Sequence, residues 1–130
     1  MIVDHCPINF EDDRGTIRDI FTHSPKENCT IIFSRQGTVR GNHYHKLSTQ
    51  YLFVIDGLLT VLTKRIDQVV VERHVLGPGD MATHLPMEAH AIIAEKDTLF
   101  LAFADGLRGG SDYELDTYRL ETPLTELAKK

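Results

Sequence analysis

Residues 37–57 have the sequence GTVRGNHYHKLSTQYLFVIDG, in which one residue separates His43 from His45. The β-branched and aromatic residues of this stretch favour extended strands. Because side chains alternate between the two faces of a strand, His43 and His45 are expected to project from one face and Tyr44 from the other. Two imidazoles about 6–7 Å apart along a strand can share a metal ion or flank a substrate. Taken alone, such a pair is as often two surface histidines.

The rest of the chain has the pattern of short strands separated by turns. Asp56-Gly57 between two apolar runs is a strong hairpin signal. A short helix is expected over 122–130, with Thr122 as its cap and Pro123 at its first position. Evenly spaced strands favour an all-β fold, either a sandwich or a barrel. We expect one domain, with a barrel core at about 16–104, a C-terminal arm and short helix at 105–130, and strands at 16–22, 29–34, 38–46, 51–55, 58–64, 69–75, 81–85, 91–94 and 98–103.

The strand expected over 51–55 is apolar on both faces. Leu52 and Val54 point one way, whereas Tyr51, Phe53 and Ile55 point the other. One set can fill a barrel, and the second set needs cover from the same chain or from a symmetry mate. The pattern favours a homodimer over a monomer.

Composition excludes several function classes. The 130 residues carry a net charge of −5, which argues against nucleic acid as a partner. There is no signal peptide and no apolar run of about 18 residues, so we predict a cytoplasmic protein with no membrane segment. Cys6 and Cys29 lack metal-ligand spacing, and each is expected to be a buried, reduced thiol.

Glycines and a polar residue flank the histidine pair at regular distances. Gly37, His43, His45, Gln50 and Gly57 resemble the first cupin motif, G-x5-H-x-H-x4-E-x6-G, with glutamine in the glutamate position. A looser second motif follows at Gly79-Asp80, Pro86 and His90, with one extra residue before the proline and Glu88 where glycine is usual. The resemblance implies the cupin double-stranded β-helix, a jelly-roll barrel in which these side chains converge.

If a metal binds in such a barrel, its ligands would be His43, His45, Gln50 and His90. Imidazole suits zinc, iron, nickel, copper or manganese. A glutamine amide is a weaker ligand than a carboxylate, so the sequence leaves open whether one divalent metal binds or none. His84 is a second candidate for the late-strand position because the extra residue before Pro86 makes the register of the second motif ambiguous. The remaining histidines, His5, His23 and His74, are expected at the surface.

Within the cupins, the chain is most similar to sugar-modifying enzymes. FEDDRG at 10–15 resembles the opening of the dTDP-4-dehydrorhamnose 3,5-epimerases. RGNHYHK at 40–46 resembles both their catalytic strand and the signature of the dTDP-sugar 3,4-ketoisomerases. It is also similar to the C-terminal cupin domain of bifunctional capsular-polysaccharide reductase/epimerases. DYELDTY at 112–118 resembles segments that follow the barrel in these enzymes.

The resemblance implies a role for each matching residue. His43 would be the base that removes a proton next to a keto group, and His45 would assist it. Arg40 would hold the nucleotide diphosphate, although it is equally a candidate for a plain surface charge. Tyr44 and Lys46 beside the histidines are further substrate-binding candidates. The tyrosine acid of the epimerases has no clear counterpart, since Tyr113 and Tyr118 lie in the tail.

The sequence therefore predicts an isomerase or epimerase in deoxysugar or surface-polysaccharide biosynthesis, acting on a nucleotide-linked keto sugar. The alternative is a metal-binding cupin outside sugar chemistry, either a dioxygenase or a non-catalytic sugar-binding module.

Overall fold

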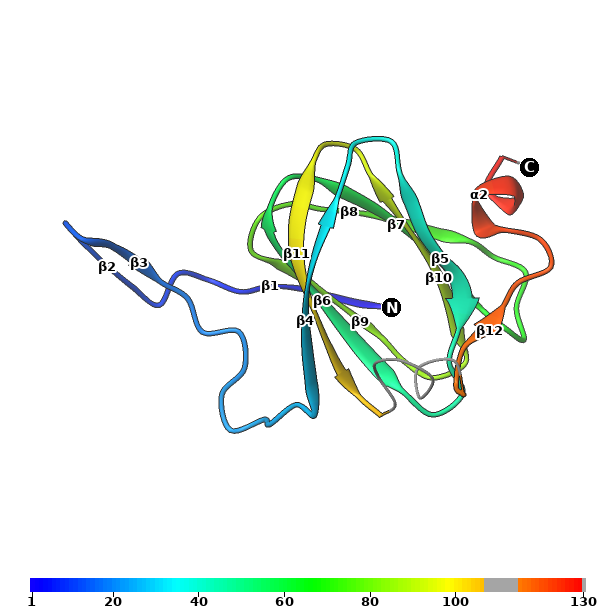
Figure 1. Ribbon diagram of the computed structural model, residues 1–130, viewed down its shortest axis with the longest axis horizontal. Helices are drawn as coiled ribbons and strands as arrows, with labels where there is room; N and C mark the ends of the chain where they lie inside the picture. The colour runs from blue at the N-terminus through cyan, green and yellow to red at the C-terminus, as the bar shows by residue number, and fades with distance from the viewer. Residues whose placement is uncertain (107–114, 130) are drawn as a thin grey trace.

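Two five-stranded antiparallel sheets pack face to face in the computed structural model, which describes residues 1–106 and 115–129 (Figure 1). One sheet has the strand order β1-β9-β6-β11-β4 and the other β12-β5-β10-β7-β8, while β2 and β3 form a separate hairpin. No helix in these two ranges is long and apolar enough to span a membrane. The strands are β1 Ile2–His5, β2 Phe10–Asp12, β3 Gly15–Ile17, β4 Asn28–Ser34, β5 Val39–Tyr44, β6 Thr49–Asp56, β7 Leu59–Arg65, β8 Glu72–Leu76, β9 Asp80–His84, β10 Glu88–Ala94, β11 Thr98–Asp105 and β12 Tyr118–Arg119, and the helix is α2 Leu124–Leu127.

The apolar core lies between the sheets. On β6, Leu52 and Val54 face inward and are buried, as the alternation along this strand predicts. They pack against side chains of both sheets, including Val61 of β7 and the fully buried Phe100 of β11. The all-β jelly-roll prediction is confirmed, and the fold is that of a cupin.

Residues from both ends of the chain cover the outer faces of the sheets. Phe21 lies edge-on against Tyr51 and Phe103, with ring centroids 5.3 and 4.8 Å apart. On the other side, Leu124 of α2 packs on the outer face of β7 and β10. The second apolar set of β6 is thus partly covered by the same chain. The outer face of edge strand β4 stays open, with Ile31 65% and Phe33 53% exposed.

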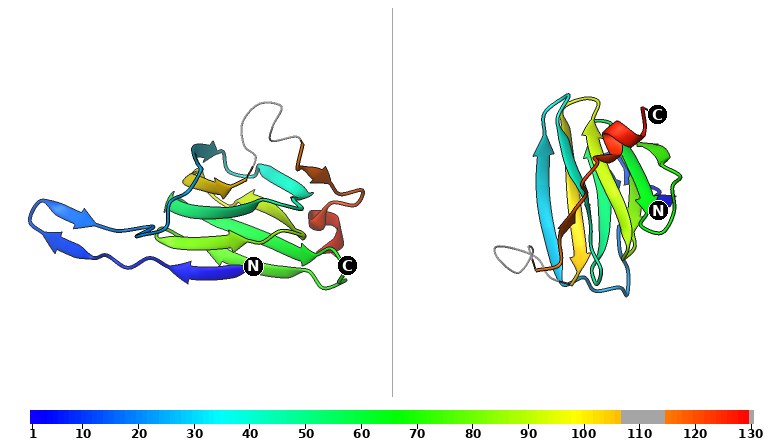
Figure 2. Two further views of the ribbon diagram at one scale, coloured as in Figure 1. Left: turned by 90° about the horizontal axis from the view of Figure 1, so that it is seen from below. Right: turned by 90° about the vertical axis from the view of Figure 1, so that its right-hand side faces the viewer.

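The prediction of a strand over 16–22 is wrong. The extended segment ends at Ile17 and pairs back with β2, so the two strands form a hairpin that projects from the barrel (Figures 1 and 2). Its turn is held by the Asp12 side chain, which accepts a hydrogen bond from the Arg14 backbone N–H at 2.9 Å. The following segment carries Phe21 across the outer face of β6 instead of continuing as a strand.

Three other expectations also need correction. Strand β10 begins at Glu88 and not at Ala91, so His90 lies inside the strand. No side chain caps α2 locally: Pro123 occupies the N-cap position, and the Leu124 N–H donates to Asn42 Oδ1 at 2.8 Å, so Thr122 is not the cap. Both cysteines are free thiols, but only Cys6 is buried, because Cys29 lies on the open outer face of β4.

A β-bulge interrupts the pairing of β5 with β10. His43 pairs with His90 and Arg40 with Ile92, which leaves Asn42 as the extra residue. His90 and Ile92 lie on one face of β10, so their partners Arg40 and His43 also share a face. In a regular strand, residues three apart would point to opposite faces. Gly41 lies in this bulge with φ +92°, and a Cβ there would lie 2.7 Å from the His90 carbonyl oxygen.

Gly41→Ala should lower the free energy of unfolding by about 1–3 kcal/mol, because the substitution combines a left-handed backbone with a backbone clash. Denaturant unfolding would measure the loss. Gly77→Ala is the matched control, since a Cβ there meets nothing within 4 Å, and it should change stability by less than about 0.5 kcal/mol. Equal stability of the two variants would contradict this account of the bulge.

Candidate active site

The barrel interior has an apolar end and a polar end. Along the inner face of β10, His90 is followed by Ile92 and Ala94, and along β6, Gln50 is followed by Leu52 and Val54. Gln50 pairs with His84 across β6 and β9. The polar members of these rows therefore gather at one end of the barrel, over a floor of apolar side chains.

Three imidazoles converge at the polar end. The ligand atoms of His43, His45 and His90 all lie within 4.8 Å of one another, and the ring centroids are 4.9 to 5.7 Å apart. His45 and His90 are buried, whereas His43 is half-buried. Strand β5 and its continuation supply two of these rings and β10 the third, as the spacing in the sequence predicts. The set has the size of a site for one transition-metal ion.

The C-terminal arm sets the tautomer of His45. Its Nδ1 lies 2.6 Å from the Asp116 carbonyl oxygen, an acceptor only, so Nδ1 carries the proton and donates it. Nε2 is then the unprotonated nitrogen, the one that can ligate a metal or accept a proton.

The Asp116 carboxylate holds the loop that follows β5. It accepts backbone hydrogen bonds from Lys46, Leu47 and Ser48, and one from the Ser48 hydroxyl at 3.0 Å. Burial opposes the charge, but these bonds outweigh it and lower the pKa of Asp116. The arm and the histidine strand are thereby joined at the edge of the site.

His84 lies beside His90 but points its nitrogens elsewhere. The two rings are stacked, with centroids 4.5 Å apart and planes at 21°. Since the lone pairs of imidazoles lie in the ring plane, two nearly parallel rings at this separation cannot both direct a lone pair at one ion. Only one of the two can then be the third ligand, and it is the His90 ligand atom that lies within 4.8 Å of those of His43 and His45.

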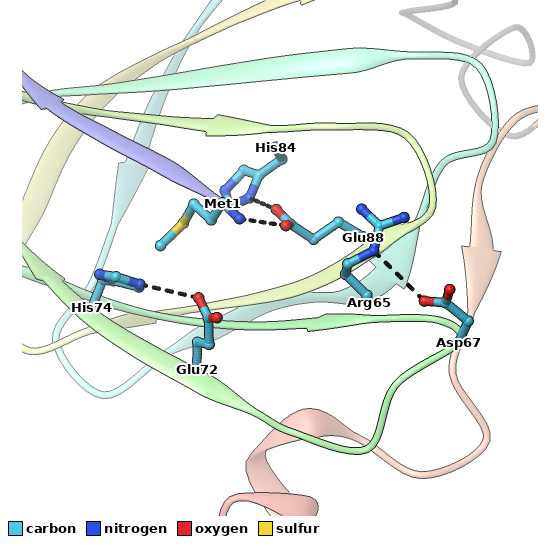
Figure 3. A network of polar contacts seen from close by, with 7 residues as sticks. All are labelled: Met1, Arg65, Asp67, Glu72, His74, His84 and Glu88. Carbon is cyan, nitrogen blue, oxygen red and sulfur yellow. Dashed lines mark hydrogen bonds and ion pairs between the residues drawn. The ribbon is translucent and has the colours of Figure 1, made fainter.

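A buried contact with Glu88 orients His84. Its Nδ1 lies 3.5 Å from Glu88 Oε1, and the other Glu88 oxygen accepts from the Met1 amino group (Figure 3). Although burial raises the pKa of Glu88, these two partners outweigh it and lower the pKa. Burial lowers the pKa of His84, and it lowers that of His90 much further, with the neighbouring histidines adding to the effect. Both rings are therefore neutral at pH 7.

A cavity of about 440 Å³ opens beside the histidines. Arg40 reaches it from β5, where its guanidinium group donates to Ser34 Oγ at 2.8 Å and to the Phe33 carbonyl oxygen at 3.1 Å. Arg119 of β12 also lines it. None of the described residues that line the cavity is a carboxylate; they are Ile32, Val39, Arg40, Gly41, His43, Gln50, Leu52, His90, Ile92, Phe100, Ala102 and Arg119.

Tyr44 and Lys46 are absent from that lining, which gives no support to substrate-binding roles for them. Tyr44 lies on the outer face of β5, stacked on Tyr118 with ring centroids 5.3 Å apart, and the Lys46 Nζ lies 4.3 Å from the Tyr118 ring centroid. Tyr113 and the rest of 107–114 lie outside the described residues. The remaining histidines lie away from the site: His5 contacts Asp80, and His74 contacts Glu72 (Figure 3).

A family comparison agrees with this architecture. Residues 10–105 match the family of polysaccharide biosynthesis C-terminal domains. The chain belongs to this family. A search of curated proteins found no significant match.

Solved structures of similar fold include several sugar enzymes. QdtA, a sugar 3,4-ketoisomerase from Thermoanaerobacterium thermosaccharolyticum solved with TDP, is 18% identical, with a TM-score of 0.74 over 92% of this chain and 88% of that one. dTDP-4-dehydrorhamnose 3,5-epimerase from Sulfolobus tokodaii is 21% identical, with a TM-score of 0.68 over 78% of this chain and 68% of that one.

CapF, a capsular polysaccharide assembling protein of Staphylococcus aureus, is 18% identical with a TM-score of 0.65. The match covers 90% of this chain but only 34% of CapF. The chain therefore spans about a third of the length of CapF.

Sequence reasoning missed Arg119 and Asp116. Both lie in the segment that was expected to be a C-terminal arm: Arg119 belongs to the two-residue strand β12, and Asp116 lies in the turn just before it. A two-residue strand is too short to produce an alternating pattern in the sequence. The available signal was the charge pattern of DTYR at 116–119, which is too common to single out a site.

The metal-free protein should lose stability as the pH falls below about 6.5. Unfolded histidines take up protons there, while the lowered pKa of His84 and of His90 keeps both neutral in the fold, so each costs up to about 1.4 kcal/mol per pH unit. Denaturant unfolding between pH 8 and 5 would measure the slope. His90→Gln should flatten it and the surface control His74→Gln should not; equal slopes for wild type and His90→Gln would contradict the assignment.

Proposed function

We propose that this protein is a nucleotide-sugar isomerase or epimerase that acts on a 4-keto-6-deoxy sugar. The observation that carries the proposal is a cavity with imidazoles and arginines in its wall and no carboxylate among its described lining residues. Such a cavity suits an anionic substrate whose reacting carbon lies next to a keto group. The fold shared with the epimerase and the ketoisomerase adds support.

His43 is the proposed base. It is the half-buried member of the three histidines and lines the cavity, so a substrate can reach it. A neutral imidazole would take the proton from C3 of the sugar, and the electron pair of the C–H bond would form the C3–C4 double bond and place charge on O4. Return of the proton to C4, with the O3 proton passing to O4, would give the 3-keto isomer; return of a proton to the opposite face of C3 would give the epimer.

Isomerisation asks for fewer groups than epimerisation does. Inversion at a carbon needs an acid on the face opposite to the base, and none of the described lining residues is a tyrosine, aspartate or glutamate. An isomerase can deliver and recover the proton on one face, from His43 with help from the adjacent His45.

Metal binding is the second arrangement that a specific observation favours. The donor set fits a divalent transition metal, because three imidazoles lie within ligand range and His45 has its outer nitrogen bonded to a carbonyl. Gln50 lines the same cavity and could add an oxygen ligand. Such an ion would act as a Lewis acid on the keto oxygen. A lone pair that ligates a metal cannot also accept a proton, so His43 would then be a ligand and not the base.

Deuterium uptake from solvent into dTDP-4-keto-6-deoxyglucose tests the base. Wild type should exchange the proton at C3 in the presence of a chelator, and His43→Gln should reduce the rate at least about 100-fold. His74→Gln, on edge strand β8 and outside the cavity lining, should exchange like wild type. Unaltered exchange in His43→Gln would rule out the base role, and exchange that stops on chelation and returns with metal would favour the ligand role.

Gln50→Glu should raise the affinity for zinc at least about tenfold, because a carboxylate binds a hard or borderline cation better than an amide does. Gln68→Glu, in an exposed turn, is the matched control and should leave the affinity unchanged. Titration of the metal-free protein against a competing chelator would measure both. No difference between the two variants would place Gln50 outside the ligand set.

We also propose that the protein is a cytoplasmic homodimer. The β2–β3 hairpin projects from the barrel with Phe10 51% and Ile17 58% exposed, and an isolated two-stranded hairpin is marginally stable in water. The open face of β4 presents a second apolar surface of the same kind. Phe33→Glu should therefore convert a dimer to a monomer in sedimentation analysis, whereas Val69→Glu, in a loop, should not; a wild-type monomer would refute the proposal.

A further inference from the structure

We infer that Arg119 is a second phosphate-binding residue of the cavity, acting with Arg40 to hold the diphosphate of a nucleotide-linked substrate. The inference deepens the proposed function and rests on it for the class of substrate. It assigns a binding role to the C-terminal arm, the segment 115–124 that runs along the edge of the second sheet.

The arm is held in register along β5 by contacts at both ends. Asp116 binds the backbone of residues 46–48, as described above. Asn42, the extra residue of the bulge, accepts the Leu120 N–H with its carbonyl oxygen at 3.0 Å and the Leu124 N–H with its side chain at 2.8 Å. Arg119 lies between these attachment points, so its backbone has a fixed position relative to the site.

The strand pairing directs Arg119 to the histidines. Arg119 pairs with His43 across β12 and β5, and Tyr118 pairs with Tyr44. Paired residues share a face, and the two tyrosines stack on the outer face, which leaves Arg119 with His43 on the inner face. Arg119 and Arg40 therefore line one cavity from neighbouring strands, with His43 in the same wall.

The charge of the cavity is opposite to that of the protein. The chain has a net charge of −5, yet the only formal charges among the described lining residues are the two guanidinium groups. Both arginines are exposed, which puts their charge at the mouth and not on the floor. A ligand with phosphates near solvent and an uncharged sugar inside matches this arrangement. Guanidinium groups bind phosphate oxygens in pairs of parallel hydrogen bonds.

A purely structural role for Arg119 gives a different expectation. β12 is held through backbone pairing and through contacts of Tyr118, Asn42 and Asp116. If the guanidinium group served only the fold, Arg119→Gln would lower the thermal midpoint and leave the affinity for TDP unchanged, so both are measured. Ligand binding can then be compared between folded proteins.

The test is calorimetric titration of wild type, Arg119→Gln, Arg119→Lys and Arg73→Gln with TDP, with thymidine as the phosphate-free probe. Arg73, on the outer strand β8, is the matched control because it loses the same charge outside the cavity. Arg119→Gln should weaken TDP binding about 10- to 100-fold, Arg119→Lys should weaken it less, and Arg73→Gln should bind like wild type. Thymidine binding should be the same for all four proteins.

Kinetics supply the second readout. Arg119→Gln should raise KM in the exchange reaction, while kcat changes less than threefold, because the residue holds the phosphates and not the reacting carbon. Unchanged TDP affinity in Arg119→Gln, or a wild type that binds neither TDP nor pyrophosphate, would overturn the inference. Arg119-dependent TDP binding without any proton exchange would support the inference while refuting the proposed reaction.

Discussion

The site depends on one extra residue in strand β5. The bulge at Gly41-Asn42 shifts the pairing with β10, and only with that shift do Arg40 and His43 face the same cavity. The backbones approach so closely there that a side chain at position 41 would overlap the His90 carbonyl oxygen. Asn42, displaced from the ladder, bonds to Leu120 and Leu124 and so fixes the C-terminal arm. One local irregularity thus sets the direction of a cationic side chain, the position of a histidine and the course of the arm.

Much of the fold could be predicted because its signals are local. Alternation along β6 identified Leu52 and Val54 as interior residues, and Asp56-Gly57 identified the hairpin to β7. The β2–β3 hairpin was missed because three-residue strands are too short for a periodic pattern. The start of β10 was misplaced because Pro86 suggests a loop, whereas the turn ends at Met87, which has φ +66°.

The part of the site that belongs to the cupin motifs could be predicted from their spacing. Spacing identified His43, His45 and His90, and the structure brings their ligand atoms within 4.8 Å. It could not choose between His84 and His90, since both lie at the polar end; in the structure the His90 ligand atom is the one that lies with those of His43 and His45. Tyr44 was predicted to bind substrate because it lies between the two histidines of the motif. A residue between two histidines that face inward must itself face outward. Arg119 and Asp116 depend on pairing between segments some 70 residues apart, about which local sequence says little.

The arm along β5 also bears on how the protein stays in solution. A strand at the edge of a sheet presents unpaired N–H and C=O groups that can template the strands of other molecules. The arm pairs with this edge of the second sheet through the two-residue strand β12 and then continues into α2. β12 is too short to serve as a template for a further strand. A chain cut before Asp116 would uncover backbone groups of β5 together with the apolar surface under Leu124. Self-association into insoluble material, and not merely weaker binding, is the expected fate of such a truncated chain.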